Sequence, residues 1–305
     1  MIRTVAFIVA AFAALSASAQ ESDESGSAEW DVPPYRIVLK TTLDAGHLDE
    51  LTVYSTEVPI YHLSDDFVRS ELTIGQETIA DDRGKPVSGH DPEKVPGTDV
   101  LGIGRPNLVF ADYSGGMHCC FKAIILMLDK PFRVQEIDLH DPGGNFHPVE
   151  GRTSLVLEAT DATFKEWRSS FADSPFPPVM LSYDPVAGRY VADPDLMRAP
   201  LPAPEELARQ KGVAREAHGA TLADGPTDYE PGFLTSPMLD LIYTGHMTEA
   251  HAFLVDSWAD SVAKRDAYWS LLTRCKLRES PYWPAVAKLN GLPATPPAAD
   301  CPNRL

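Results

Sequence analysis

Residues 104–128, GRPNLVFADYSGGMHCCFKAIILML, hold two apolar stretches separated by a double glycine and a histidine, and the second stretch begins with two adjacent cysteines. The stretches 107–113 and 119–128 are short, rich in β-branched and aromatic residues, and bounded by Gly, Pro and Asp. This composition predicts two neighbouring β-strands. The histidine and the cysteines between them form the one cluster in the chain whose chemistry goes beyond packing.

Further segments of the same kind surround this pair. Strands are predicted at residues 35–40, 51–55, 132–139, 154–159 and 179–183. In 132–139, Phe132 and Val134 are expected to face inward and Gln135 outward, with a β-bulge near Glu136 where the alternation slips.

After residue 192 the apolar spacing becomes helical. Ala250, Phe253, Leu254 and Trp258 fall on one face of a predicted helix. Other helices are predicted at 204–218, 238–244, 261–278 and from Ser280 to Gly291. The fold class expected is therefore α+β, with a strand-rich domain followed by an α-helical C-terminal domain.

The expected organisation has five parts. They are a signal peptide at 1–19, a flexible lead at 20–33, a β-rich repeat-like domain at 34–192, a linker or covering segment at 193–236, and an α-helical domain with a proline-rich tail at 237–305. The lead and the linker are assigned from their content of Gly, Pro, Ser, Asp and Ala.

The N-terminus has the features of a secretory signal. Arg3 precedes the apolar run 5–15, and Ala17-Ser18-Ala19 has the small-x-small form of a cleavage site. The run is too short to span a bilayer, and no later stretch is long and apolar enough to do so. We therefore expect a periplasmic or secreted protein whose mature chain is not inserted in a membrane.

The chain is strongly acidic. The chain has 44 Asp and Glu residues against 26 Lys and Arg, which gives a net charge of −18. Repulsion from phosphates disfavours nucleic acid and anionic lipid as partners. An envelope protein or a small ligand is the expected partner.

Four cysteines would meet an oxidising compartment after export. They allow three disulfide pairings. Cys275 and Cys301 lie close in sequence and are expected to form a disulfide, with two buried thiols as the alternative. The proline-rich tail cannot pack as a regular element, so a bridge would explain its cysteine.

His118, Cys119 and Cys120 admit three interpretations. They form a zinc or copper site, completed by His140 or His147. Alternatively, Cys119 and Cys120 form a vicinal disulfide, which requires a distorted turn. The third interpretation is that both cysteines are small packed residues in a strand.

Catalysis is not indicated by any established pattern. The chain lacks GxSxG, HExxH and P-loop sequences. Ser114 beside His118 suggests a hydrolase, but two such neighbours do not specify a triad. Whether the protein is an enzyme is left open, with a non-catalytic role favoured.

One internal repeat is visible, because GRPNLV at 104–109 recurs as GRTSLV at 151–156. A spacing of 47 residues is typical of a propeller blade or a similar four-strand unit. Residues 99–120 resemble the β-repeat of FG-GAP, integrin-α N-terminal-like proteins, and more closely secreted bacterial proteins with an SGGxHCC segment. The resemblance covers 98–192 and implies a partial propeller-like fold.

The aspartates of such repeats often hold calcium. Here Asp99 matches, but Ile103 and Asn107 stand where acidic residues are usual. Because calcium takes six to eight oxygen ligands, calcium binding is not carried over. The expected function is an exported, non-catalytic binding or structural module of the cell envelope. The alternative is a soft-metal-binding or hydrolytic protein centred on Ser114, His118, Cys119 and Cys120.

Overall fold

A computed structural model describes residues 26–42, 48–65, 73–74, 77–78, 99–116, 119–139, 145–223 and 232–301. It has several largely antiparallel sheets followed by a C-terminal helical region, which confirms the α+β class. The expected signal peptide lies outside the described residues. No helix in the described part is long and apolar enough to cross a membrane.

Three sheets make up the strand-rich region. The first contains β1 (Gly26–Val32), β2 (Tyr35–Thr42), β3 (Leu48–Ser55) and β4 (Val58–Asp65). The second contains β7 (Asn107–Gly116), β8 (Cys119–Met127) and β9 (Arg133–Asp138). The third has the order β13 (Arg189–Ala192), β12 (Pro178–Asp184), β11 (Val156–Thr160), β10 (Asn145–His147), β5 (Thr73–Ile74) and β6 (Glu77–Thr78).

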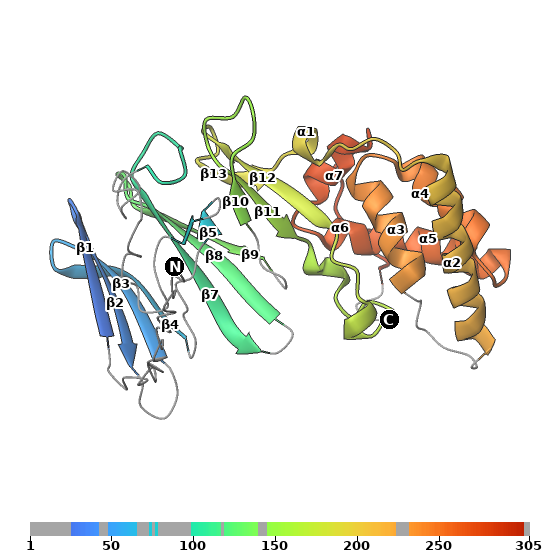
Figure 1. Cartoon of the computed structure of the whole chain (residues 1–305), viewed down its shortest axis with the longest axis horizontal. Coiled ribbons are helices and arrows are strands. Elements are labelled where there is room, and N and C mark those ends of the chain that lie inside the picture. Colours follow the sequence, from blue (N-terminus) through green and yellow to red (C-terminus); the bar gives the residue numbers. More distant parts are fainter. Residues whose placement is uncertain are drawn as a thin grey trace, which may run out of the picture.

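The second sheet lies between the other two (Figure 1). Ile124 and Leu126 of β8 pack in one core with the first sheet. Ala123, Ile125 and Met127 pack in another core, which continues into the third sheet and the helices. The apolar run of β8 is continuous because both faces of the strand are buried, and each large side chain contributes about 1.5–3 kcal/mol.

The two copies of the repeat adjoin one another. The Leu155 N–H donates to the Leu101 carbonyl at 2.9 Å. Gly102 has a φ of +67°, and a Cβ there would lie 2.3 Å from the Thr153 carbonyl oxygen, so the close approach requires glycine. The first copy leads into the meander β7–β8–β9 and the second into β11–β12–β13.

The carboxylate of Asp99 stabilises the turn that leads into β7. It accepts from the Ile103 N–H at 2.7 Å, the Gly104 N–H at 2.6 Å and the Asn107 side-chain amide at 3.1 Å. Asn107 is fully buried and accepts from the Leu101 N–H. The Asp–Asn pair therefore closes the turn through hydrogen bonds.

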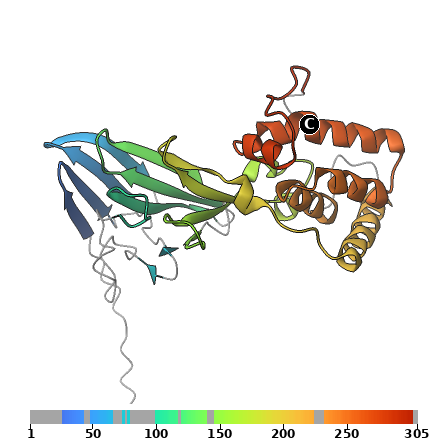
Figure 2. The ribbon, with the colours of Figure 1, turned by 90° about the horizontal axis from the view of Figure 1, so that it is seen from above.

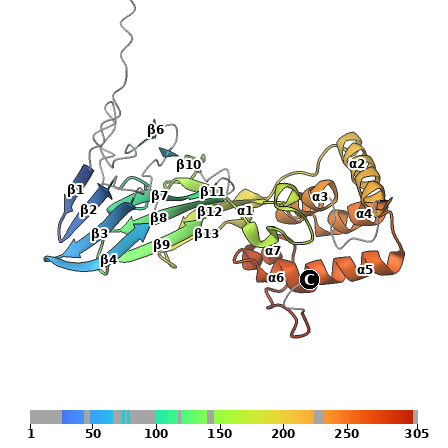
Figure 3. The same ribbon diagram turned by 90° about the horizontal axis from the view of Figure 1, so that it is seen from below.

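Helices form the other end of the molecule, as the views from above and below show (Figures 2 and 3). They are α1 (Pro194–Met197), α2 (Pro204–Ala223), α3 (Gly232–Tyr243), α4 (Met247–Ser257), α5 (Val262–Leu271), the π-helical turn η4 (Leu272–Lys276), α6 (Leu277–Glu279) and α7 (Trp283–Leu289). Ala250, Phe253, Leu254 and Trp258 are buried, as the spacing predicts.

The expectation of a flexible lead is wrong for the described part of the interval 20–33. These residues include β1, which pairs along its full length with β2. Trp30 anchors this strand against Phe110, with ring centroids 6.0 Å apart. The interval 193–236, expected to be a linker or covering segment, contains α1, α2 and the start of α3, and α2 includes the predicted helix 204–218.

Cys275 and Cys301 form the expected disulfide, with Cα atoms 5.7 Å apart. The bridge ties the proline-rich tail to η4, and the Trp283 indole N–H donates to the Thr295 carbonyl at 3.1 Å. In the chain-entropy model a closed loop of this length stabilises the fold by about 3.5 kcal/mol.

Asp161 joins the strands to the helices. It follows β11, is 1% exposed, and accepts hydrogen bonds from the hydroxyls of Tyr243 and Ser280. It also accepts from the Thr163 N–H at 2.8 Å. A buried carboxylate is tolerated here because several donors surround it.

We predict that Asp161→Ala lowers the free energy of unfolding by about 3–5 kcal/mol, since it leaves buried donors without an acceptor. Urea unfolding followed by circular dichroism measures the loss. Glu158→Ala, at an exposed position on β11, is the control and should change stability by less than about 0.5 kcal/mol. Equal stability of the two variants would contradict the role given to Asp161.

Candidate functional site

The His–Cys–Cys cluster lies largely outside the described residues. This holds for His118 and His140, and for the side chains of Ser114, Cys119 and Cys120. Gly116 at the end of β7 pairs with Cys119 at the start of β8. His147 lies in β10 opposite Val156.

Within the described residues, no group of three or more His, Cys, Asp or Glu side chains is placed to hold a metal ion. Since most of the cluster lies elsewhere, the zinc or copper site, the vicinal disulfide and the hydrolase all stay predictions.

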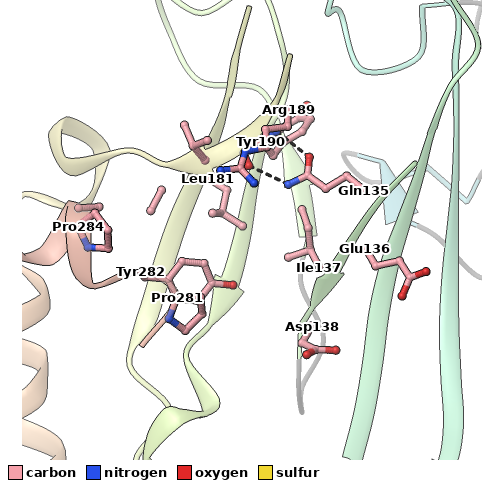
Figure 4. A pocket seen from close by; sticks show the side chains of 13 residues that line it. Gln135, Glu136, Ile137, Asp138, Leu181, Arg189, Tyr190, Pro281, Tyr282 and Pro284 are labelled. Atoms are coloured by element: carbon pink, nitrogen blue, oxygen red, sulfur yellow. Dashed lines mark hydrogen bonds between the residues drawn. The ribbon is translucent and has the colours of Figure 1, made fainter. Parts of the chain in front are cut away.

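A cleft of about 420 Å³ lies where β9, β13 and the N-terminal end of α7 meet (Figure 4). Its lining residues are Gln135, Glu136, Ile137, Asp138, Leu181, Arg189, Tyr190, Val191, Ala192, Pro281, Tyr282, Pro284 and Ala285. The volume is in the range of small-ligand sites, and the lining is mainly apolar with a few polar groups, as such sites usually are.

Gln135 bridges the two strands at one end of this cleft. Its side-chain nitrogen donates to the Tyr190 carbonyl at 2.8 Å, and its side-chain oxygen accepts from the Tyr190 N–H at 2.7 Å. This pair of bonds resembles the exchange between two residues of a hydrogen-bonded pair in an antiparallel sheet. The carboxamide therefore takes the place of the N–H and C=O of one residue of an additional strand, and the two bonds are drawn in Figure 4.

Among the strands that the structure describes, none pairs with the outer edge of β13. The Asp193 N–H donates to the Met180 carbonyl at 2.8 Å, and this bond sets the alternation along the β12–β13 pair. Backbone groups of Val191 then face β12, whereas those of Tyr190 and Ala192 face away from it. Tyr190 meets Gln135, and Ala192 is the next position along the edge.

The outer edge of β9 likewise has no strand partner in the described part of the chain. The Leu128 N–H donates to the Pro106 carbonyl at 2.9 Å, which sets the alternation in the second sheet. It follows that the backbone groups of Glu136 and Asp138 face away from β8. None of the hydrogen bonds between described residues uses these outward groups of Glu136, Asp138 or Ala192.

Apolar side chains form the walls. Ile137 and Leu181 are buried, and the Tyr282 ring lies across the cleft from Ile137 (Figure 4). Burial raises the pKa of the Tyr282 phenol well above its ordinary value, and the charges of Asp161 and Asp138 add to this effect. Tyr282 therefore presents a neutral hydroxyl at neutral pH.

Charged groups lie at the two ends. Arg189 is beside Tyr190, and Asp138 is near the opposite end (Figure 4). Glu136 points to the other side of β9, where its carboxylate accepts from the Tyr61 hydroxyl at 3.3 Å. Its backbone is thus the part of Glu136 available to the cleft.

The predicted β-bulge near Glu136 is wrong. The β8–β9 register runs without a shift from Lys122–Asp138 to Met127–Arg133. The alternation appeared to slip because both faces of β9 pack: Val134 contacts the core of the first sheet, and Ile137 the core of the third. Gln135 was read as solvent-facing, since its partner is 55 residues away.

Searches of known protein families, curated proteins and solved structures found nothing that matches this chain.

Three phenols give the structure an expected pH dependence. Burial is the largest cause that raises the pKa of Tyr190, Tyr243 and Tyr282 above the ordinary 10.0, and for Tyr243 the Asp161 charge adds to it. Each phenol has a higher pKa in the folded state than in the unfolded state. Its contribution to the free energy of unfolding is therefore complete below about pH 10 and declines above that pH.

Urea unfolding between about pH 9 and pH 11.5 measures this decline. Tyr282→Phe and Tyr190→Phe should each make the decrease of stability with pH shallower than in the unmodified protein. Identical slopes in all three proteins would contradict the buried, neutral state of these phenols.

Proposed function

We propose that the protein is an exported, non-catalytic binding protein of the cell envelope, and that the cleft between β9, β13 and α7 is its ligand site. The observation that carries the proposal is a cleft with an apolar wall, lined by Glu136, Asp138 and Ala192, whose outward backbone groups take part in no hydrogen bond between described residues. Such groups are strong donors and acceptors, and a ligand would satisfy them.

The surroundings of the cleft favour a preformed site. Gln135 fixes the distance between the two strands, and Asp161 ties α7 to the third sheet through Ser280. The Ser280 hydroxyl in turn accepts from the Tyr282 N–H at 3.0 Å, so the wall residue Tyr282 is held by the same network. A rigid site loses little entropy on binding.

The lining favours binding over catalysis. It offers the Asp138 carboxylate, one guanidinium and two phenols, and its lining residues include no Ser, Thr, Cys, His or Lys. A nucleophile paired with a base is the usual sign of covalent catalysis, and the described lining does not offer one. Export is supported by the disulfide, which persists in oxidising compartments, together with the expected signal peptide.

A variant that fills the cleft tests the proposal. We expect Pro284→Trp to place an indole at the cleft and to abolish the binding of neutral aromatic and amide fragments detected by fluorine NMR. Val186→Trp is the matched control, because Val186 is 96% exposed at the β12–β13 turn, and it should retain every hit. A fragment screen without hits, or hits that bind both variants equally, would contradict the assignment.

A further inference from the structure

We infer that the ligand of this cleft is an extended peptide segment, which continues the edge of β13 at Ala192, next to the position of Tyr190 that Gln135 already occupies. The inference rests on the proposed function and specifies its ligand class. Recognition of a peptide through an exposed strand edge is an established binding mode, in which backbone hydrogen bonds give affinity and pockets for alternate side chains give specificity.

The first argument is the bound carboxamide of Gln135. The Gln135 carboxamide donates to the Tyr190 carbonyl and accepts from the Tyr190 N–H, which are the two hydrogen bonds that the N–H and C=O of one strand residue would form there. The edge of β13 is thus already shown to accept an amide in strand-like geometry. The neighbouring position, Ala192, offers the same pair of groups in the same direction.

The second argument comes from the backbone groups of β9 on the opposite side of the cleft. The outward backbone groups of Glu136 and Asp138 belong to β9, which also lines the cleft. An inserted strand has donors and acceptors along both of its own edges, so it can pair with β13 on one side and approach β9 on the other. A ligand without repeating amides would leave one edge unsatisfied.

The residues that line the cleft indicate which side chains the bound peptide would carry. Ile137, Leu181 and Tyr282 favour an apolar side chain at the centre of the segment. Arg189 and Asp138 carry opposite charges at the two ends, which favours a peptide with one basic and one acidic residue flanking the apolar part. Since an extended residue spans about 3.3 Å, a pentapeptide covers this stretch of edge.

The probe is the capped peptide acetyl-Lys-Val-Leu-Val-Glu-amide, titrated into the full mature chain and followed by isothermal calorimetry and amide NMR. We expect saturable binding with shifts at Ala192 and at the Gln135 side-chain amide. Three analogues, N-methylated at each central residue in turn, lack one N–H each. At least one analogue should bind at least tenfold more weakly, because its missing N–H is one that pairs with the edge.

Ala192→Pro tests the protein side. It removes an N–H that faces the cleft and not β12, and edge strands tolerate proline at such positions. We expect at least a tenfold loss of peptide affinity, whereas Ala192→Ser keeps the N–H and should bind as the unmodified protein does. The analogues do not depend on the folding of any variant, so they decide the question if Ala192→Pro is unfolded.

Equal affinity of all three N-methylated analogues and the parent peptide would overturn the inference. The inference would also be overturned if the peptide failed to bind while fragments still bound at the cleft and lost that binding in Pro284→Trp. That result would leave the proposed function standing. If neither the peptide nor any fragment binds at the cleft, the proposed function fails as well.

Discussion

The burial of β8 on both faces is the constraint from which the architecture follows. A strand with apolar side chains on each side requires a layer against each face, and the first and third sheets supply these layers. β9 pairs with β8, and the side chain of Gln135 on β9 reaches the backbone of Tyr190 on β13 at the margin of the stack. The cleft therefore forms where the meander β7–β8–β9 packs beside the meander β11–β12–β13, because β9 and β13 are not paired with each other.

The elements along the chain were largely predictable. The strands around residues 107–128 and the helix carrying Phe253 and Leu254 have clear periodicity, so local composition was sufficient. The Cys275–Cys301 bridge followed from sequence proximity. In contrast, β1 was missed because its sequence, GSAEWDV, begins with small residues and contains two acidic ones, and its order comes from pairing with β2.

The candidate site was not predictable in the same way. Gln135, Tyr190 and Tyr282 come from three distant parts of the chain and meet only after the sheets and α7 have packed. No spacing rule links them, and a glutamine in an alternating strand looks like a surface residue. The sequence instead drew attention to His118 and its neighbours, whose chemistry stays a prediction.

Amide hydrogen exchange, read by NMR on the ligand-free protein, tests the central claim most directly. The account predicts a protected Tyr190 amide, held by Gln135, and a protected Val191 amide, held by β12, beside rapidly exchanging amides at Ala192, Glu136 and Asp138. Protection of those three amides as strong as that of the β8 core would contradict it, because the two strand edges would then be closed rather than open to a ligand.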